Sequence, residues 1–293
     1  MNKFLIIVIF LSCLGAEEKY DLIWRFRNGL VNIMPQKFTI EKKLYLISPN
    51  GDKTKVETEE GVVNNTIYWK VENVINDSQA LVVNLVKDGK IKIKKNGETH
   101  KLSMTNPLKN MDKALQPPFK NYQALTHGGM AFLLDIEQQK VLVTWILHIQ
   151  EDGSYKKEMF KGKQDPHGMS GQYQQLINQK VSIGTEWDMT RTDFRGFTYK
   201  NHYTFERITS YKGKPVAEVK AEGEIFLGNN LIGRVNGYYY HDYKTRLMLF
   251  YEMNEQVDQI IIRKDENNQE KKYLLEIHVK NEFVLQETNA KLK

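Results

Sequence analysis

The chain of 293 residues has one cysteine, seven prolines and, after its first sixteen residues, no long uncharged run. The cysteine, Cys13, lies inside the apolar N-terminal stretch, so the rest of the chain has no thiol for a disulfide. No later segment approaches the about 20 apolar residues that a membrane-spanning helix requires. Tyrosine and phenylalanine are frequent, at 15 and 13 residues, which favours strands. The composition predicts a β protein stabilised by its apolar core alone.

The usual motifs of enzyme chemistry are also missing. The sequence has no Gly-x-x-x-x-Gly-Lys phosphate-binding loop, and its seven histidines form neither a His-x-x-x-His nor a His-Glu-x-x-His pattern. Residues 167–171 resemble the nucleophile elbow of α/β-hydrolases, but Gln172 stands where that motif needs glycine. His127-Gly128-Gly129 resembles their oxyanion loop, without the strand–turn–helix context of that fold. We therefore predict no catalytic residue, no metal site and no cofactor.

An enzyme alternative rests on residue types alone. A glycosidase needs two opposed carboxylates, and Glu186, Asp188 and Asp193 lie near Trp187 in the sequence. Any chain with 36 acidic residues offers such candidates, so the grouping is not specific. This alternative is a hydrolase of envelope glycans or esters that uses His127 or an acidic pair near Trp187.

The net charge of +6 comes from lysine and glutamate residues that interleave along the chain, which argues against nucleic-acid binding. Lys90, Lys92 and Lys94 alternate with other residues, so they share one face of a predicted strand. This face could contact an anionic envelope surface. The alternative is that the lysines keep an exposed sheet edge from pairing with other chains.

Residues 1–16 predict export. They combine a basic start, an apolar run over 4–11 and small residues before an acidic pair, which is the pattern of a secretory signal peptide. We expect a secreted or periplasmic protein of the cell envelope.

Cys13 has two predicted fates. Cleavage after Gly15 or Ala16 would remove it with the signal peptide. Alternatively, residues 10–13 resemble the lipobox of bacterial lipoproteins, although the first two of them depart from the residues usual there. Cys13 would then carry a lipid that anchors the mature protein to a bacterial membrane.

The region 181–252 carries the clearest strand pattern. Along Lys214–Leu227, one set of alternate residues is apolar or small and the other is mostly charged, so one face of this strand is apolar and the other polar. Gly228-Asn229-Asn230 supplies residues suited to a tight turn. Val235–Tyr243 is expected to return antiparallel to it.

Similar hairpins are expected along the rest of the chain. The predicted strands outside 181–252 are 20–27, 37–47, 53–58, 66–74, 79–87, 90–94, 98–104, 122–126, 130–136, 140–150, 259–263 and 273–279. A turn is expected at Asp88-Gly89, and residues 106–120 are predicted to form a short helix or a loop.

The predicted fold class is all-β with few short helices, in antiparallel meander sheets that form strongly curved half-barrels or a sandwich. The polar stretch 153–171 is the best candidate for a linker or long loop. It would separate an N-terminal antiparallel β domain, 17–152, from a C-terminal one, 172–293. A faint similarity between 66–91 and 201–226 reflects either two similar halves or a chance likeness between hairpins.

Aromatic residues are more numerous than one packed sheet face needs. The candidate ligand-binding residues among them are Trp187, Phe197, Tyr199, Tyr203, Phe205 and Tyr239. They would line a groove on a curved sheet that holds an apolar or lipid-like ligand. The alternative is that these residues fill the core.

Gly184-x-x-Trp187 and the meander that follows it as far as Tyr251 also carry a resemblance. They look like uncharacterised secreted proteins of the bacterial cell envelope and are more distantly similar to half-barrel carriers of the LolA/LppX lipid- and lipoprotein-binding type. The resemblance implies no catalytic residues. We expect a non-enzymatic secreted or cell-envelope protein that binds an apolar or amphipathic ligand on a curved, aromatic-lined sheet. The alternatives are the hydrolase and a structural or adhesion module.

Overall fold

A computed structural model describes residues 18–20, 22, 27–76, 79–103, 128–135, 140–149, 154–159, 180–192, 196–245 and 247–288. Within these ranges the chain forms fourteen strands and no helix. The strands are β1 (Val31–Ile47), β2 (Lys53–Val74), β3 (Gln79–Lys95), β4 (Glu98–Ser103), β5 (Gly128–Asp135), β6 (Lys140–Ile149), β7 (Tyr155–Met159), β8 (Glu186–Thr192), β9 (Phe197–Tyr211), β10 (Lys214–Leu227), β11 (Asn230–Asp242), β12 (Leu247–Lys264), β13 (Glu270–Val284) and β14 (Gln286–Thr288). The predicted all-β fold class is confirmed.

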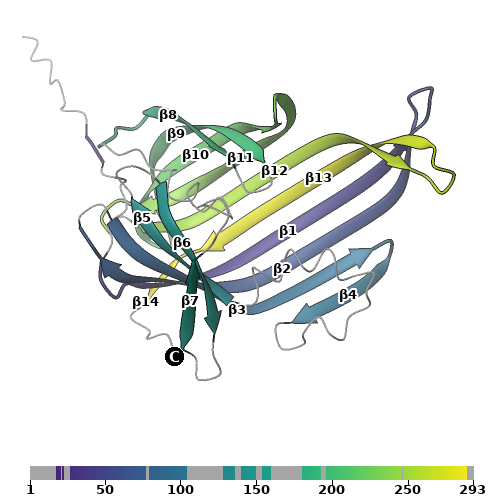
Figure 1. Cartoon of the computed structure of the whole chain (residues 1–293). Helices are drawn as coiled ribbons and strands as arrows, with labels where there is room; N and C mark the ends of the chain where they lie inside the picture. Colours follow the sequence, from purple (N-terminus) through teal and green to yellow (C-terminus); the bar gives the residue numbers. More distant parts are fainter. Residues whose placement is uncertain are drawn as a thin grey trace, which may run out of the picture.

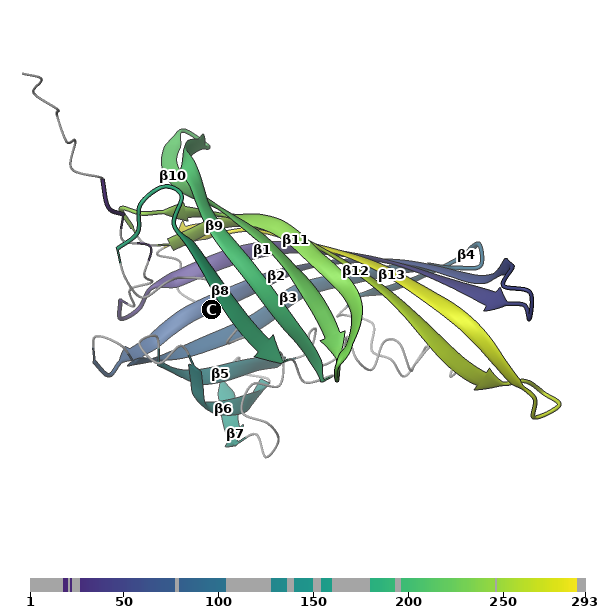
Figure 2. The same ribbon diagram turned by 90° about the horizontal axis from the view of Figure 1, so that it is seen from above.

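All fourteen strands belong to one antiparallel sheet, in the order β7-β6-β5-β3-β2-β1-β13-β12-β11-β10-β9-β8, with β4 paired to β3 and β14 to β1. The order ends at β7 and β8, so the sheet is open. Figures 1 and 2 show β12, β13, β1 and β2 running side by side, with β8–β11 and β5–β7 bending away from them. The molecule is therefore a single, strongly curved antiparallel sheet.

The two expected domains contribute to this one sheet, because β1 pairs with β13 from Gln36↔Phe283 to Ile47↔Lys272. Strand β7 lies inside 153–171, the expected linker or long loop, and residues 160–179 lie outside the described ranges. The boundary between the domains stays a prediction. The expected signal peptide and the expected short helix or loop at 106–120 also lie outside the described residues.

Two of the expected breaks in the strands are wrong. β2 is continuous from Lys53 to Val74, and β3 runs through Asp88-Gly89, where a turn was predicted. The pairing of these two strands shifts register between Asn64 and Thr66. A bulge absorbs extra residues without ending the ladder, so turn-forming residues here bend the strands and do not reverse them.

The sheet has two chemically different faces. In β10, Ala217, Val219 and Ala221 are buried on one side, which we call the inner face. Lys220 and Glu222 point to the other side, the outer face, where they form an ion pair of 2.9 Å. The alternation predicted for this strand is therefore confirmed over these residues, and β11 pairs antiparallel with β10 as predicted.

Two glycines of β11 lie close against β12. A Cβ atom at Gly237 would collide with the backbone oxygen of Glu252 and the sulfur of Met253. A Cβ at Gly233 would collide with the backbone oxygen of Gln256. Strands β11 and β12 thus approach each other in a way that a side chain would prevent. We call this close approach the crease between β11 and β12.

The largest core cluster lies on the inner face and draws buried residues from both bent parts of the sheet, among them Trp69, Phe132, Phe205 and Tyr239. A smaller cluster on the outer face contains Val83, Leu85, Ala131 and Leu147.

The apolar residues at alternate positions 141, 143, 145, 147 and 149 predict one continuous apolar face along β6, and this prediction is wrong. Val141 belongs to the inner cluster, whereas Trp145 and Leu147 belong to the outer one. The register of β5 with β6 shifts between Leu133 and Leu134, and the extra residue moves the following side chains to the opposite face.

Candidate ligand-binding faces of the sheet

The six aromatic residues expected to bind ligand come together on the inner face. Tyr199, Tyr203, Phe205 and Tyr239 are at most 2 % exposed, and Trp187 and Phe197 are partly buried against the same cluster. The Trp187 ring stacks on Tyr203 with centroids 5.6 Å apart, and Tyr203 lies 6.1 Å from Tyr239. The residues are thus packing partners of one another. Their contact with a ligand stays a prediction.

A polar cluster of residues from β8, β9 and β12 lies beside these aromatic side chains on the inner face. The hydroxyl of Tyr199 donates a hydrogen bond to a carboxylate oxygen of Glu255 at 3.3 Å. The guanidinium of Arg191 lies 3.9 Å from the centroid of the Tyr199 ring, in a cation–π contact. Burial lowers the pKa of Arg191, but Tyr199 and Glu255 outweigh it, so the pKa is raised and the cation retained. Arg191 was not among the residues predicted from the sequence. It alternates with Trp187 and Met189, and this spacing indicates that the three side chains share one face of the strand.

Beyond the aromatic core, the inner face continues as an apolar band along three adjacent long strands. We call this band the inner strip; its members are Phe38, Ile40, Leu44 and Leu46 of β1, Val257 and Ile261 of β12, and Tyr273, Leu275, Ile277 and Val279 of β13. Leu44 and Val257 are buried, and the other eight are half-buried. The alternation in 273–279 predicts that Tyr273, Leu275, Ile277 and Val279 share the apolar side, and this is confirmed.

The amide of Gln259, which pairs with Leu275, and one ion pair interrupt this apolar face. Lys42 lies beside Ile277 in the register, and its Nζ is 2.7 Å from Oε1 of Glu59 on β2. The Glu59 side chain is only 8 % exposed. A carboxylate so far from water requires such a partner, so this pair keeps the middle of the face charge-neutral.

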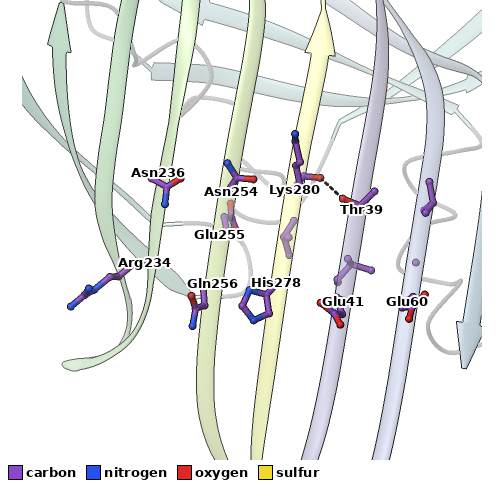
Figure 3. A pocket seen from close by; sticks show the side chains of 14 residues that line it. Thr39, Glu41, Glu60, Arg234, Asn236, Asn254, Glu255, Gln256, His278 and Lys280 are labelled. Atoms are coloured by element: carbon purple, nitrogen blue, oxygen red, sulfur yellow. Dashed lines mark hydrogen bonds between the residues drawn. The ribbon is translucent and has the colours of Figure 1, made fainter. Parts of the chain in front are cut away.

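The outer face of the same strands is polar and hollowed. A groove of about 650 Å³ crosses β11, β12, β13, β1 and β2, and Figure 3 shows Asn236, Asn254, Gln256 and His278 on neighbouring strands along it. Lys280 in this groove is 2.9 Å from Glu252, and that hydrogen bond raises the pKa of the lysine. The groove therefore presents amides and paired charges, which suit a polar ligand and not an apolar one.

A second outer groove, of about 430 Å³, lies over β13, β1, β2 and β3 and includes Lys37 and Lys90. Lys90, Lys92 and Lys94 are exposed, and Lys92 pairs in register with Lys101 of β4. Because β3 lies between β2 and β4 here, it is not an edge strand. The interpretation that these lysines protect a sheet edge is therefore wrong.

Glu186 and Asp188, the described acidic residues of the hydrolase alternative, lie at the surface. His202 Nδ1 is 2.7 Å from Asp188 and its Nε2 is 3.6 Å from Glu186, on side chains 45–85 % exposed. His127 and Asp193 lie outside the described residues. In the part of the chain that the structure describes, no group of three or more His, Cys, Asp or Glu residues is arranged to hold a metal. Over the same ranges, no helix could cross a membrane.

No protein-family model and no curated protein matches the chain. Among solved structures, lipovitellin, studied for lipid–protein interactions, is similar at a TM-score of 0.47 and 10 % identity over 92 % of this chain. The chain spans only 26 % of the lipovitellin chain. A protein described as exported, with a YmcC-like fold, from Bacteroides fragilis has a TM-score of 0.21 at 10 % identity, over 88 % of this chain and 97 % of that one. A mutant of the monoaromatic hydrocarbon channel TodX has a TM-score of 0.25 at 8 % identity, over 88 % and 91 % of the two chains.

All three TM-scores are below 0.5, and the identities are 10 % or lower. The expected curved antiparallel sheet is present. The likeness to half-barrel carriers beyond that sheet stays a prediction.

Proposed function

We propose that the protein is a non-enzymatic, exported protein that binds an apolar or amphipathic ligand along the inner strip. The observation that carries the proposal is the continuity of this strip with the core. Val257 and Ile277 belong to the core or pack against it, and the apolar positions continue through Leu275 and Tyr273 on the same face.

Half-buried apolar side chains in a continuous band favour an elongated apolar ligand. Each methylene group removed from water contributes about 0.8 kcal/mol, so an acyl chain laid along the strip would bind mainly through its hydrocarbon. The outer face of the same strands offers His278, Lys280 and amides, which water solvates well. The two faces thus divide the sheet into a ligand side and a solvent side.

The aromatic core has a different role in this proposal. Tyr199, Tyr203 and Tyr239 are already packed against one another, so they shape and stiffen the curl from which the strip extends. Trp187 and Phe197, which are only partly buried, are the members of the predicted aromatic set best placed to touch a ligand.

Uptake of a fluorescent fatty acid by delipidated protein tests the proposal. Ile40→Thr combined with Leu275→Thr should weaken uptake at least about tenfold, because two half-buried apolar side chains become polar while the strand propensity is kept. The matched control is Leu274→Thr, the neighbouring leucine on the outer face, which should leave uptake unchanged. Delipidated protein that takes up no fatty acid, or equal loss in variant and control, would overturn the proposal.

Export is the second part of the proposal and rests on residues 1–16. We propose that this segment directs secretion, and that the mature protein either lacks Cys13 or carries a lipid on it. The mass of the mature N-terminus from the native host decides between these forms. A mature chain that retains Met1 would contradict export by this route.

A second candidate function is adhesion to an anionic envelope surface through Lys90, Lys92 and Lys94. Their common exposure on the outer face beside Lys101 favours it. Lys92→Glu with Lys94→Glu should abolish binding to anionic envelope preparations. Unchanged binding would argue against this role.

A further inference from the structure

Large apolar side chains are exposed on the outer face at the free end of the long strands. Ile260 and Ile262 of β12 are 63 % and 59 % exposed. Ile260 pairs with Leu274 of β13, which pairs in turn with Tyr45 of β1. We call Tyr45, Ile47, Ile260, Ile262 and Leu274 the tip patch. Figure 1 shows this end of the sheet projecting beyond the rest of the molecule.

The tip patch departs from the pattern of the strands that carry it. Closer to the body, the outer positions of β12 and β13 are polar, with Gln256, Asp258, Glu276 and His278. At the tip, the apolar residues run without alternation through 260–262, 273–275 and 44–47. A sheet with one solvated face should alternate apolar and polar residues, so the outer face at the tip has the composition of a covered surface.

Cations lie in and around the patch. Lys264 follows it on the outer side of β12, and Lys272 of β13 pairs in register with Ile262 and Ile47 and so lies between them. Arg263 and Lys271 pair with each other on the inner side, where Arg263 lies 5.8 Å from the centroid of the Tyr273 ring. On β2, Lys53 pairs in register with Ile47 and Lys55 pairs with Tyr45. Lys271 is neutralised by Asp265 at 3.0 Å. A small apolar surface with a basic rim fits the boundary between the headgroups and acyl chains of an anionic bilayer, because lysine and arginine reach the headgroups while apolar side chains enter below them.

We propose that the tip patch docks the protein on the surface of an anionic lipid bilayer. Self-association is the less favourable occupant, because two copies meeting through the same patch would bring their basic rims together. The inner strip occupies the same stretch of the strands on the opposite face, with Ile261 and Tyr273 between the residues of the patch. Docking itself is independent of the proposed function; only its use to load ligand into the strip rests on it.

Co-sedimentation of the mature protein with phosphatidylcholine vesicles, with and without phosphatidylglycerol, tests the proposal. Ile260→Thr with Ile262→Thr should weaken binding to the anionic vesicles at least about tenfold, because two exposed apolar anchors are lost. The matched control is Leu227→Thr with Leu231→Thr, leucines that are 36 % and 51 % exposed away from the tip, and it should bind as the wild type does.

The basic rim is tested separately. Lys264→Gln with Lys272→Gln, two exposed lysines on the outer side, should weaken binding only to the vesicles that contain phosphatidylglycerol, and added salt should weaken the wild type in the same way. Lys214→Gln with Lys244→Gln, two exposed lysines elsewhere, is the control and should change neither.

Three outcomes would overturn docking. They are a wild-type protein that binds no vesicles, equal binding by the isoleucine variant and its control, and a solution dimer that the isoleucine variant dissociates without any vesicle binding. The isoleucine variant should still take up fluorescent fatty acid in solution without vesicles. Loss of uptake in the Ile40→Thr, Leu275→Thr variant with intact vesicle binding concerns the strip alone, so failures of the two proposals are distinguishable.

Discussion

The hydroxyl of Tyr199 in β9 lies 3.3 Å from a carboxylate oxygen of Glu255 in β12, although β10 and β11 separate these strands in the sheet. Three strand spacings in a flat sheet amount to about 14 Å, which is more than two side chains can bridge. The contact therefore requires the inner face to curl until β9 faces β12. This curl closes over the aromatic core and leaves the long strands beyond it uncurled.

The Tyr199–Glu255 contact should contribute measurably to stability. Tyr199→Phe removes the hydroxyl but keeps the ring under Arg191. It should lower the free energy of unfolding by about 1.5–2 kcal/mol, the lower end for a hydrogen bond to a charged acceptor, because the contact is 3.3 Å long. Urea unfolding measures it. Tyr238→Phe on the outer face is the matched control and should change the free energy by about 0.5 kcal/mol or less. Equal losses of unfolding free energy in the two variants would contradict this prediction, because the Tyr199 hydroxyl would then be stabilised no more by Glu255 than by water.

The crease between β11 and β12 should tolerate no side chain at Gly237. Gly237→Ala places a methyl group against the Glu252 backbone and the Met253 sulfur, and should cost about 2–3 kcal/mol through overpacking. Gly213→Ala, in the turn between β9 and β10, meets no atom within 4 Å but has φ of 77°, so it should cost only about 1 kcal/mol of backbone strain. Urea unfolding measures both losses. If Gly213→Ala lowers the free energy of unfolding more than Gly237→Ala does, then the close approach of β11 to β12 is not the reason for glycine at position 237.

Local patterns predicted much of this fold because each hairpin carries its own information. The alternation in Lys214–Leu227 and the turn residues after it determine β10 and β11 without reference to the rest of the chain. The pairing of β1 with β13 had no such signal, since Gln36 and Phe283 lie far apart in the sequence. Bulges also escaped prediction, because an extra residue in a ladder has no fixed sequence signature.

The candidate site was predictable only in part for the same reason. Parity along β9 placed Tyr199, Tyr203 and Phe205 on one face, and the structure has them there. Which residue faces Tyr199 across the curl depends on how sharply the sheet bends between β9 and β12, and that is a property of strand pairing. Glu255 could therefore not be chosen from the many acidic residues by sequence alone.

The ion pair in the apolar face gives a third prediction. Lys42→Met leaves the nearly buried Glu59 carboxylate without its cation and should lower the free energy of unfolding by about 2–3 kcal/mol. Lys42→Met with Glu59→Leu removes both charges and should recover to within about 1 kcal/mol of the wild type. The double variant also makes the face more apolar, so it should take up fluorescent fatty acid at least as well as the wild type. A double variant as unstable as the single one would contradict this account.

The buried imidazole of His241 should make stability depend on pH. His241 is 1 % exposed, and burial lowers its pKa from 6.5 to about 3. The unfolded chain takes up a proton near pH 6.5, whereas the folded chain does so only near pH 3, so the unfolded state binds more protons between these values. Stability should therefore be flat above pH 6.5 and fall by about 1.4 kcal/mol per pH unit below it.

His241→Phe, which keeps a ring beside Tyr239, should remove this dependence. Between pH 6.5 and 5, urea unfolding of the wild type should lose about 2 kcal/mol more than the variant does. His202→Asn, at an exposed histidine, is the matched control and should keep the wild-type slope, because the buried imidazole is still present. If the variant and the wild type lose stability in parallel as the pH falls, then His241 takes up its proton in the folded protein and the curl is open to water at that position.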